Sequence, residues 1–539
     1  MQRIYGSIKG FRASEINALE RLYRRKVPPD SVVTHELCTE MARLSRQVGI
    51  QIGLLINRGG AVEYVIAGRA TGITIPKLNR GRTHPGRLQG LRLIHTHLNN
   101  EELSYEDLTD LAMLRLDLVY AITVSNTGEP LLAYGGHLVP KNSLSGVWQV
   151  LKPVPTHRIT IPFDRFIKDL EERITRSHSY QKVDTDEDRG IIVAIFPKLS
   201  EDSRIRLAEF EDLARSANIN VLDTVVQKRP KPDPKFVVGK GKLSQIVINA
   251  LAIDANLLIF NHELSPSQAR AISDFTDLRV IDRTQLILDI FARRAKTKEG
   301  KIQVELAQLK YNMPRLVGAR PTLSRLAGGI GTRGPGETKL EIDRRRAKER
   351  ISRLEHEISR ISKKRKLTRQ KRNKNSTPII SIIGYTNSGK STLLNTLTKS
   401  DVLVANMPFA TLDPSSKRLR FPRDIDVVIT DTVGFLRELP NELKAAFMAT
   451  LEELAEADLL LEIADLTDPN IEDKIQAVES ILKDLNLDTK PRMKVFNKAD
   501  KCDLSIAESL SNRYKGVAIS AINKSSLPPL IERMQKFFI

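Results

Sequence analysis

The eight residues GYTNSGKS, 384–391, constrain the fold of this chain more than any other stretch. They match the pattern G-x-x-x-x-G-K-[ST], whose glycines let backbone amides turn inward around phosphate oxygens. An apolar run, PIISIIGY, leads into them and a helix-like run, STLLNTLTK, follows. A loop of this kind sits between a strand and a helix, so the pattern predicts an α/β domain over residues 375–539.

Further motifs follow in the order expected of a guanine-nucleotide site. DTVG, NKAD and SA occupy residues 431–434, 497–500 and 520–521. The carboxylate of Asp500 suits the N1–H and N2–H donors of guanine, which adenine lacks on that edge. Thr411, in PFATLDP, lies where a switch threonine contacts magnesium and the γ-phosphate. The set predicts a site for GTP, GDP and Mg²⁺.

Each motif supplies residues with an expected role. We expect Lys390, Thr411 and Gly434 to act on the γ-phosphoryl group. Ser391, Thr411 and Asp431 are the expected magnesium ligands. The predicted nucleotide contacts are Gly384, Asn387, Ser388, Gly389, Lys390, Ser391, Thr392, Asp431, Gly434, Asn497, Lys498, Asp500, Ser520 and Ala521. The chain is therefore predicted to be a GTPase, which converts GTP and water into GDP and phosphate.

The residue after DTVG bears on the rate of this reaction. Many GTPases have a glutamine there that orients the attacking water, whereas this chain has Phe435. An apolar side chain cannot orient water by hydrogen bonding. We therefore expect slow intrinsic hydrolysis and a partner that completes the site.

The 539 residues exceed one compact core, so several domains are expected. Residues 1–155 read as an α+β extension, in which an amphipathic helix precedes a hairpin. Residues 156–188 are polar and charged, which predicts a linker. Strands alternate with helices over 189–283, which indicates a small parallel α/β subdomain. Residues 284–374 are expected to be helical, with a glycine-rich loop inside a long basic hairpin.

The formal net charge of +20 indicates a polyanionic partner. Residues 337–374 carry 16 Lys or Arg and 6 Asp or Glu, whereas residues 375–539 carry 20 and 23. Half of the excess charge thus lies in the basic hairpin. Aromatic residues make up only 5%, so a base-stacking platform is not expected, and the charge suits an RNA phosphate backbone. We expect no DNA partner.

The two cysteines, Cys38 and Cys502, are far apart in the chain, which argues against a disulfide framework and for a reducing compartment. No run approaches the roughly 18 apolar residues of a membrane span, and the N-terminus has no signal pattern. These features predict a soluble cytoplasmic protein without a membrane span. We expect it to be a monomer, although none of these features bears on its oligomeric state.

The motifs GYTNSGKS, PFATLDP, DTVGF and NKAD, preceded by GGIGTRGPGETKLEIDRRR, resemble the HflX family of translation-associated GTPases. VVGKGKL (237–243) and LSPSQ (264–268) are also similar to the N-terminal domain of that family. The resemblance covers about residues 186–539. It implies a protein that binds the large ribosomal subunit and its rRNA and splits or rescues ribosomes, with GTP as a timer. The expected ribosome contacts are Arg333, Arg344, Arg345 and Arg346.

The N-terminal extension contains a second informative stretch, LIHTHLNNEELSYEDL. It resembles the H-x-H and S-x-x-D pattern of JAMM/MPN-type (RadC-like) zinc peptidases. That resemblance implies Zn²⁺ bound by His95, His97 and Asp107. The gap between the two patterns is one residue shorter than in that family, and Leu98 replaces its proline. The catalytic glutamate is not identified by its context; Glu36 and Glu40 are upstream candidates.

Three other functions compete with ribosome splitting. A large-subunit assembly GTPase would use the same basic hairpin and the same slow site. A metal-dependent hydrolase in residues 1–155, regulated by the GTPase, would need a glutamate near the histidines. An RNA scaffold that needs no nucleotide fits poorly with a complete set of GTPase motifs. Glycines and lysines in VVGKGKL also leave open a second nucleotide site in 189–283, although their spacing is not that of a P-loop.

Overall fold

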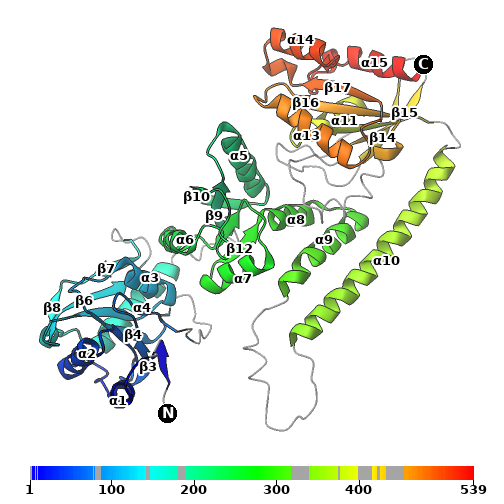
Figure 1. Cartoon of the computed structure of the whole chain (residues 1–539). Coiled ribbons are helices and arrows are strands. Elements are labelled where there is room, and N and C mark those ends of the chain that lie inside the picture. Colours follow the sequence, from blue (N-terminus) through cyan, green and yellow to red (C-terminus); the bar gives the residue numbers. More distant parts are fainter. Residues whose placement is uncertain are drawn as a thin grey trace. The chain divides into compact units, whose positions relative to one another are not determined.

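The computed structural model describes residues 3–6, 8, 10–76, 78, 87–140, 146–179, 188–316, 339–373, 377–398, 415–421, 425–431 and 454–539. These form two compact units, one of Met1–Arg189 with Val238–Asn256 and the other of Gly190–Val237 with Leu257–Ile539. Within the described residues, no helix is both long and apolar enough to span a membrane. The predicted fold class, a multidomain α/β protein with a C-terminal P-loop domain, is confirmed (Figure 1).

The N-terminal unit is built on an eight-stranded sheet in the order β1-β3-β2-β4-β5-β6-β7, with β8 paired to β6. Strands β2 and β3 form the expected antiparallel hairpin. Strands β4 and β5 are parallel, and helix α3 connects them. The strands are β1 (Ile4–Gly6), β2 (Ile52–Asn57), β3 (Val62–Ala67), β4 (Leu91–His97), β5 (Leu118–Val124), β6 (Pro130–Leu138), β7 (Trp148–Val150) and β8 (Val154–Pro155).

Helices cover the N-terminal sheet, and a contact with one of them, α2, shows which way the side chains of strand β4 point. The hydroxyls of Ser45, in α2, and Thr96 lie 2.7 Å apart, so Thr96 faces α2. Alternate residues of a strand face opposite sides, and His95 and His97 therefore point away from α2. The helices are α1 (Ala13–Arg21), α2 (His35–Val48), α3 (Tyr105–Leu114) and α4 (Phe163–Ser179).

Helix α4 lies in residues 156–188, where the sequence predicts a linker, and for this segment that prediction is wrong. The amide of Phe163 donates to the Asp30 carbonyl oxygen at 2.7 Å, and the Arg92 guanidinium carbon lies 4.2 Å from the Phe163 ring centre. One face of the helix joins the N-terminal core through Phe163, Ile167, Leu170 and Ile174. These residues repeat at helical spacing, but charged neighbours mask the pattern in composition.

Helix α6 (Lys240–Ala252) makes contacts with the N-terminal unit. The sequence places it in the 189–283 subdomain, whereas it belongs to the compact N-terminal unit. Its Leu251 packs against the N-terminal core, and its Lys240 interacts electrostatically with Asp110 of α3. Periodicity predicts that a segment is helical; it does not say which core will cover the helix.

The second unit begins with a four-stranded sheet in the order β10-β9-β11-β12. Strand β11 is parallel to both β9 and β12, as the alternation of strands and helices predicts. A buried cluster of aliphatic and aromatic side chains joins this sheet to its helices. The elements are β9 (Asp188–Phe196), α5 (Glu201–Ser216), β10 (Ile219–Lys228), β11 (Leu257–Phe260), α7 (Pro266–Phe275), β12 (Arg279–Asp282) and α8 (Arg283–Arg294).

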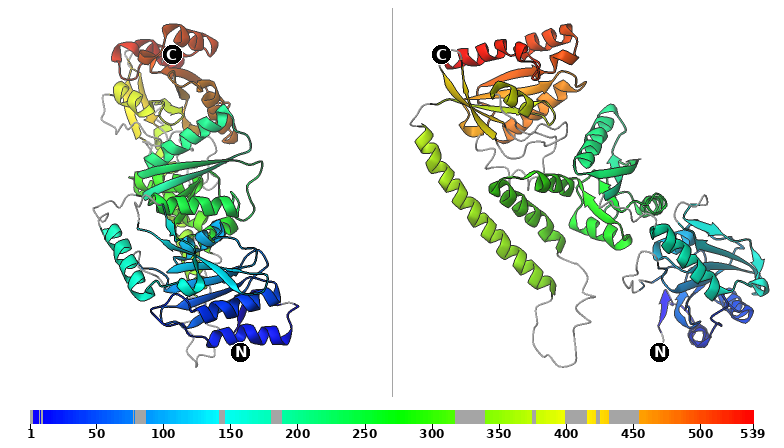
Figure 2. Two further views of the ribbon diagram at one scale, coloured as in Figure 1. Left: turned by 90° about the vertical axis from the view of Figure 1, so that its left-hand side faces the viewer. Right: turned by 180° about the vertical axis from the view of Figure 1, so that it is seen from behind.

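Helices α9 (Lys298–Leu316) and α10 (Lys339–Asn373) lie side by side and form the predicted helical hairpin (Figure 1 and Figure 2). Ile302 and Leu306 of α9 pack with Leu354 of α10. Arg350 donates two hydrogen bonds to the Glu305 carboxylate, at 2.7 and 2.9 Å. We call this pair the basic arm, and its seam follows the spacing expected from the sequence.

The C-terminal domain has a six-stranded sheet in the order β14-β15-β13-β16-β17-β18. Strand β14 is antiparallel to β15, and the other neighbouring strands of this sheet pair in parallel. The carboxyl ends of the central strands therefore meet at one edge. The elements are β13 (Ile379–Gly384), α11 (Lys390–Thr398), β14 (Ser415–Arg420), β15 (Asp426–Asp431), β16 (Leu459–Asp465), α13 (Ile471–Asp484), β17 (Arg492–Asn497), α14 (Leu504–Arg513), β18 (Val517–Ala518) and α15 (Pro528–Phe538).

Candidate functional site

The phosphate-binding loop joins β13 to α11, where the sequence predicts it. Gly384 and Gly389 have φ angles of 147° and 92°. A Cβ atom at Gly384 would lie 2.3 Å from the carbonyl oxygen of Ile463. A Cβ atom at Gly389 would lie 2.2 Å from Nδ2 of Asn497. Both backbone conformation and close contact therefore require glycine at these two positions.

Two side chains at the start of α11 face the loop and strand β15. Lys390 is buried, and its Nζ donates to the Tyr385 carbonyl oxygen at 2.7 Å. Burial lowers the pKa of Lys390 to about 8, although the Asp431 carboxylate opposes this shift. The hydroxyl of Ser391 donates to Oδ2 of Asp431 at 2.5 Å. A buried ammonium and two oxygen groups thus lie at the carboxyl edge of the sheet.

The NKAD and SA motifs meet the phosphate-binding loop through Asn497. Its Nδ2 donates to the Ser388 carbonyl oxygen at 2.8 Å, and its Oδ1 accepts from the Ala521 amide at 2.8 Å. The Ser520 hydroxyl donates to Oδ1 of Asp500 at 2.6 Å. Hydrogen bonds therefore join the phosphate-binding loop, NKAD and SA, although the first and last of these motifs are more than 100 residues apart in the sequence.

Asp465, which no sequence motif marks, also belongs to the site, because it pairs with Lys498 of the NKAD motif. Lys498 adopts a φ of 65°, and its Nζ lies 2.6 Å from Oδ2 of Asp465. Asp465 ends β16, so it stands at the same edge of the parallel sheet as Asp431 and Asn497. The apolar run LLLEIAD, which ends in this carboxylate, carried the signal: polar residues that end parallel strands gather at the ligand edge.

The remaining predicted nucleotide residues divide into two groups. Asn387 adopts a φ of 63° in the loop, and Thr392 lies in the first turn of α11. Thr411, Gly434 and Phe435 lie outside the described residues, as does Arg333.

Comparison with known proteins matches three family models to consecutive segments. A model described as "GTP-binding GTPase N-terminal" covers residues 204–292, and one described as "GTP-binding GTPase Middle Region" covers residues 294–372. A third, described as "50S ribosome-binding GTPase", covers residues 379–498. All three begin after residue 203, so none of them extends over the eight-stranded sheet.

Relatives from bacteria decide the family. The GTPase HflX of Caldanaerobacter subterraneus subsp. tengcongensis is 47% identical over 351 residues, which are 65% of this chain and 81% of the relative. The GTPase HflX of Escherichia coli is 41% identical over 350 residues, which are 64% of this chain and 82% of the relative. The chain belongs to the HflX family of GTPases. It therefore binds and hydrolyses GTP, and the predicted family is confirmed.

Solved structures include a GTP-binding protein from the archaeon Sulfolobus solfataricus in complex with GDP. It is 26% identical to this HflX-family chain and has a TM-score of 0.36; the match covers 65% of this chain and 98% of that one.

The basic arm of this HflX-family protein carries three of the predicted ribosome contacts. Arg344, Arg345 and Arg346 are exposed near the start of α10. The Arg345 guanidinium lies 3.9 Å from the Glu349 carboxylate, an exposed contact that neutralises little of the local charge. Lys348 and Arg353 extend the exposed basic surface along the helix.

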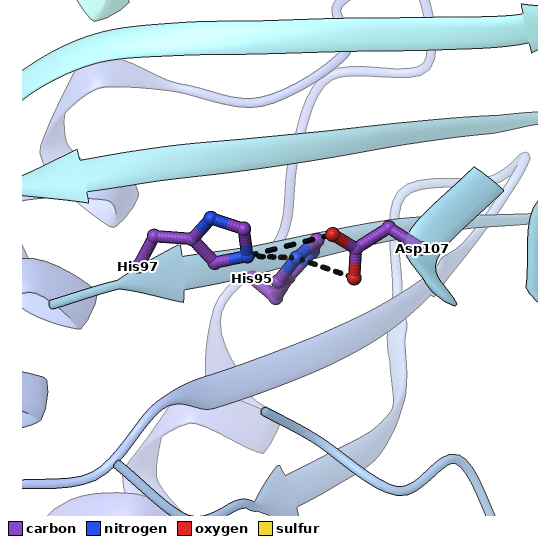
Figure 3. A group of neighbouring side chains, drawn as sticks. All are labelled: His95, His97 and Asp107. Atoms are coloured by element: carbon purple, nitrogen blue, oxygen red, sulfur yellow. Dashed lines mark hydrogen bonds and ion pairs between the residues drawn. The ribbon is translucent and has the colours of Figure 1, made fainter. Parts of the chain in front are cut away.

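The N-terminal unit brings His95, His97 and Asp107 together, and Figure 3 shows their side chains converging. Nε2 of His95 lies 2.9 Å from Nε2 of His97 and 3.1 Å from Oδ1 of Asp107. Nε2 of His97 lies 3.6 Å from Oδ2 of Asp107. All three residues are buried. Their potential ligand atoms lie within 4.8 Å of one another, so the residues fit one metal ion.

Hydrogen bonds hold two of these side chains in place. The His97 Nδ1 atom lies 2.9 Å from the Glu101 carbonyl oxygen, so this nitrogen carries the proton and Nε2 has the lone pair. Burial and the neighbouring His95 lower the pKa of His97, which favours the neutral ring. Oδ2 of Asp107 accepts from the amide and hydroxyl of Ser104, at 2.8 and 2.7 Å, in a capping box of α3.

Neither candidate glutamate belongs to this cluster, which corrects the expectation for Glu36 and Glu40. Both lie in α2, which packs on the opposite face of β4 from the histidines. Glu40 instead pairs with Arg25 at 2.7 Å. The sequence contains no indication of which sheet face a helix will cover, so a position before the histidines was not enough to identify a base.

Proposed function

We propose that this HflX-family GTPase associates with the large ribosomal subunit and its rRNA, and that it splits or rescues ribosomes. The observation that carries the proposal is the exposed arginine triplet Arg344–Arg346 on the basic arm. One matched family model is described as a 50S ribosome-binding GTPase, which supports the same partner. In this proposal the slightly acidic C-terminal domain binds and hydrolyses GTP, and the basic arm contacts the phosphate backbone of the rRNA.

At the nucleotide site we assign the roles from the residue positions. Lys390 places a positive charge on the β- and γ-phosphates, and the loop amides bind the same oxygens. Asp500 accepts hydrogen bonds from guanine, while Asn497 holds the two adjoining loops together. The Ser391 hydroxyl and Asp431 carboxylate, with Thr411, would hold magnesium, whose preferred ligands are oxygen atoms. When bound, magnesium neutralises charge that develops on the phosphates.

Hydrolysis needs a further group, because the side chain of Phe435 cannot orient water. The ribosome supplies or positions that group, and the GTP-bound state persists until it does so. The protein acts as a monomer in the cytoplasm and is partly ribosome-associated. A large-subunit assembly GTPase is the alternative; it would act on immature particles and leave intact ribosomes joined, which sedimentation profiles distinguish.

Reversing the charge of Arg344, Arg345 and Arg346 to Glu tests the ribosome proposal. We expect large-subunit affinity to fall about 100-fold near physiological salt, with a salt slope reduced by about 3, because phosphate contacts are lost. Binding is measured by pelleting at several salt concentrations. The control reverses Arg204 and Arg206, which lie on α5. Unchanged affinity and slope in the triplet variant would refute the proposal.

We also propose that His95, His97 and Asp107 bind a divalent metal of the zinc class. Two imidazoles and one carboxylate are a common zinc ligand set, and three ligands leave a position for water or substrate. Among the described residues, no glutamate joins the cluster, so the proposal is metal binding; the metal-dependent hydrolase remains the alternative. The neighbours of His97 and Asp107 fix both ligands, as in outer-shell support of metal sites.

Metal content of the full-length protein tests this second proposal. We expect about one zinc ion per chain in the wild type. His97→Ala should lose that zinc, because the two ligands that remain, His95 and Asp107, bind the ion only weakly. The control is His137→Ala, a buried histidine of β6 outside the cluster. Elemental analysis after dialysis, with melting temperatures before and after chelation, gives the readout. Equal metal content in wild type and His97→Ala would reject the site.

A further inference from the structure

A buried polar cluster ties the end of α9 to the four-stranded sheet. Asp282, at the end of β12, has a side chain only 2% exposed, and that of Arg315, in the last turn of α9, is 16% exposed. Nη2 of Arg315 donates to Oδ2 of Asp282 at 2.7 Å and to the Leu264 carbonyl oxygen at 2.6 Å. The Tyr311 hydroxyl also donates to Oδ2 of Asp282. We call Asp282, Tyr311 and Arg315 the α9 clamp.

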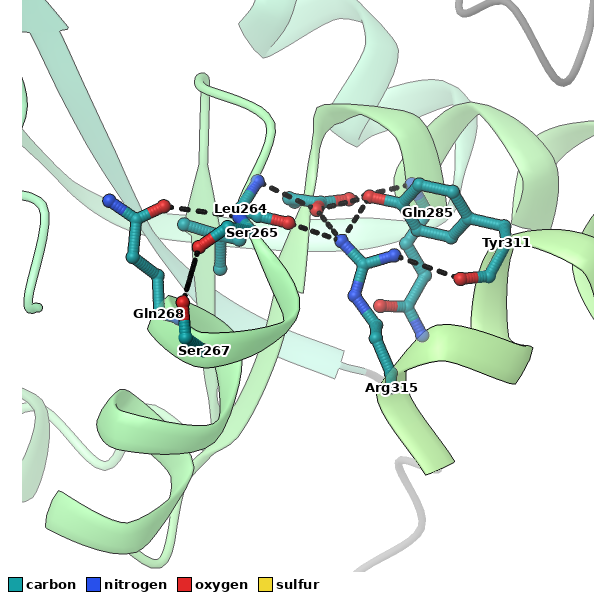
Figure 4. Close-up of polar contacts among 8 residues, drawn as sticks. Leu264, Ser265, Ser267, Gln268, Gln285, Tyr311 and Arg315 are labelled. Carbon is teal, nitrogen blue, oxygen red and sulfur yellow. Dashed lines mark hydrogen bonds and ion pairs between the residues drawn. The ribbon is translucent and has the colours of Figure 1, made fainter. Parts of the chain in front are cut away.

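The clamp joins four segments of the subdomain. Asp282 accepts from the Gln285 amide at 2.9 Å, which caps α8, and from the Leu264 amide at 3.0 Å. The Arg315 guanidinium carbon lies 3.7 Å from the centre of the Tyr311 ring. Figure 4 shows Arg315 and Tyr311 directed from α9 towards Leu264 and Gln285. One carboxylate thus links the ends of β12 and α9, the start of α8 and the loop after β11.

The α9 clamp binds the first residue of the LSPSQ motif, Leu264, through its backbone. Both backbone groups of Leu264 bind the clamp, its amide to Asp282 and its carbonyl oxygen to Arg315. Ser265 and Gln268 form the capping box of α7, and Nε2 of Gln268 donates to the Asp233 carbonyl oxygen at 2.9 Å. The motif therefore fixes a short loop against which the last turn of α9 is held.

The clamp and the arginine triplet lie at the same end of the basic arm. Ion pairs join Lys298 to Glu357 and Glu305 to Arg350, so residue numbers rise along α9 as they fall along α10. Moving from Glu305 towards the end of α9 thus corresponds to moving from Arg350 towards Arg344–Arg346. Since both helices rise 1.5 Å per residue, the triplet lies alongside the turns of α9 that contain Tyr311 and Arg315.

We propose that the α9 clamp is a positioning device for the basic arm: it holds the arginine triplet in the orientation that engages the large ribosomal subunit. This inference rests on the proposed function. The buried Asp282–Arg315 pair has a specific geometry fixed by several hydrogen bonds, whereas attraction between aliphatic side chains is non-directional. Burial raises the pKa of the Tyr311 hydroxyl, which keeps its proton and remains a donor to Asp282.

Two substitutions loosen the clamp without removing its bulk. The Asp282→Asn variant can still cap α8 but loses the charge that holds Arg315. Tyr311→Phe removes one hydroxyl and keeps the ring beneath the guanidinium. We expect large-subunit affinity to fall about tenfold in Asp282→Asn and about threefold in Tyr311→Phe, with basal GTP turnover unchanged. The matched control, Glu209→Gln, breaks the partly buried Arg283–Glu209 pair of the same subdomain.

A distance measurement separates this inference from the ribosome proposal. Spin labels at Arg204→Cys on α5 and Lys348→Cys on α10, in a background without Cys38 and Cys502, report how α10 is oriented relative to the sheet. We expect a narrow distance distribution in wild type and Glu209→Gln, and a broad one in Asp282→Asn. Narrow distributions in every variant, or full subunit affinity in both clamp variants, would overturn the inference. Wild type that fails to bind subunits would instead refute the ribosome proposal.

Discussion

GTP turnover by a Lys390→Met variant is expected to fall about 1000-fold, because the variant lacks the positive charge that stabilises the transferring phosphoryl group. Methionine keeps much of the side-chain volume, so packing at the start of α11 is retained. The Tyr385 carbonyl oxygen, which now accepts from Lys390, is the group that loses a donor. A loss of this size corresponds to about 4 kcal/mol of transition-state stabilisation.

The free energy of unfolding of the nucleotide-free protein should not fall along with GTP turnover in this variant. Burial lowers the pKa of Lys390 to about 8 from an ordinary value of 10.5, so the folded state binds this proton less tightly than the unfolded state. Lys390 therefore destabilises the empty protein by about 3 kcal/mol below pH 8, and this cost declines as pH rises from 8 towards 10.5. Lys390→Met removes it, and we expect no decrease in the melting temperature at pH 7.

Phosphate release, calorimetric GTP titration and melting curves measure these effects together. The matched control is Lys494→Met, since Lys494 lies on β17 of the same domain and pairs with Glu479 at 2.8 Å, away from the loop. It should retain turnover and nucleotide-induced stabilisation. Turnover within tenfold of wild type in Lys390→Met, together with a preserved shift in melting temperature on GTP addition, would contradict the role assigned to Lys390.

The nucleotide domain was predictable because its constraints are local in sequence. A strand, a loop with two required glycines and a helix must follow one another, and the structure has β13, the loop and α11 in those places. The meeting of Asn497 with Ser388 and Ala521 follows from the rule that parallel strands end at one edge. Asp465 obeys the same rule and was missed because no motif marks it.

The errors concern which core covers a helix, a property that depends on contacts distant in sequence. The apolar residues of α4 have helical spacing in the sequence. The contacts of Phe163 with Asp30 and Arg92 in the structure show that the helix packs on the N-terminal unit. Helix α6 is a related case, because its contacts group it with the N-terminal unit although its place in the sequence is between strands of the four-stranded sheet. Likewise, residues two apart on a strand share one face, so H-x-H spacing is enough to bring the two histidines together, whereas the separation of Glu36 and Glu40 from them depends on where α2 packs.

The base specificity of the site should depend on Asp500. We expect Asp500→Ala to weaken GDP binding by about 100- to 10,000-fold, because a carboxylate that accepts from N1–H and N2–H of guanine contributes two charge-assisted hydrogen bonds of about 1.5–3 kcal/mol each. The Ser520 hydroxyl already donates to Oδ1 of Asp500 and fixes the carboxylate before nucleotide arrives. Asp503→Ala, an exposed carboxylate that precedes α14, is the control.

Inosine diphosphate distinguishes base recognition from a general loss of affinity, because it lacks only the N2 amino group of GDP. Wild type should prefer GDP over inosine diphosphate by about tenfold or more, whereas Asp500→Ala should bind the two almost equally, since the acceptor for N2–H is gone. Calorimetry or competition with a fluorescent nucleotide gives both constants. The contrary outcome is that Asp500→Ala binds both nucleotides more weakly and keeps the wild-type preference for GDP. In that outcome Asp500 would only brace Ser520, and another group, such as the Ala521 amide, would recognise guanine.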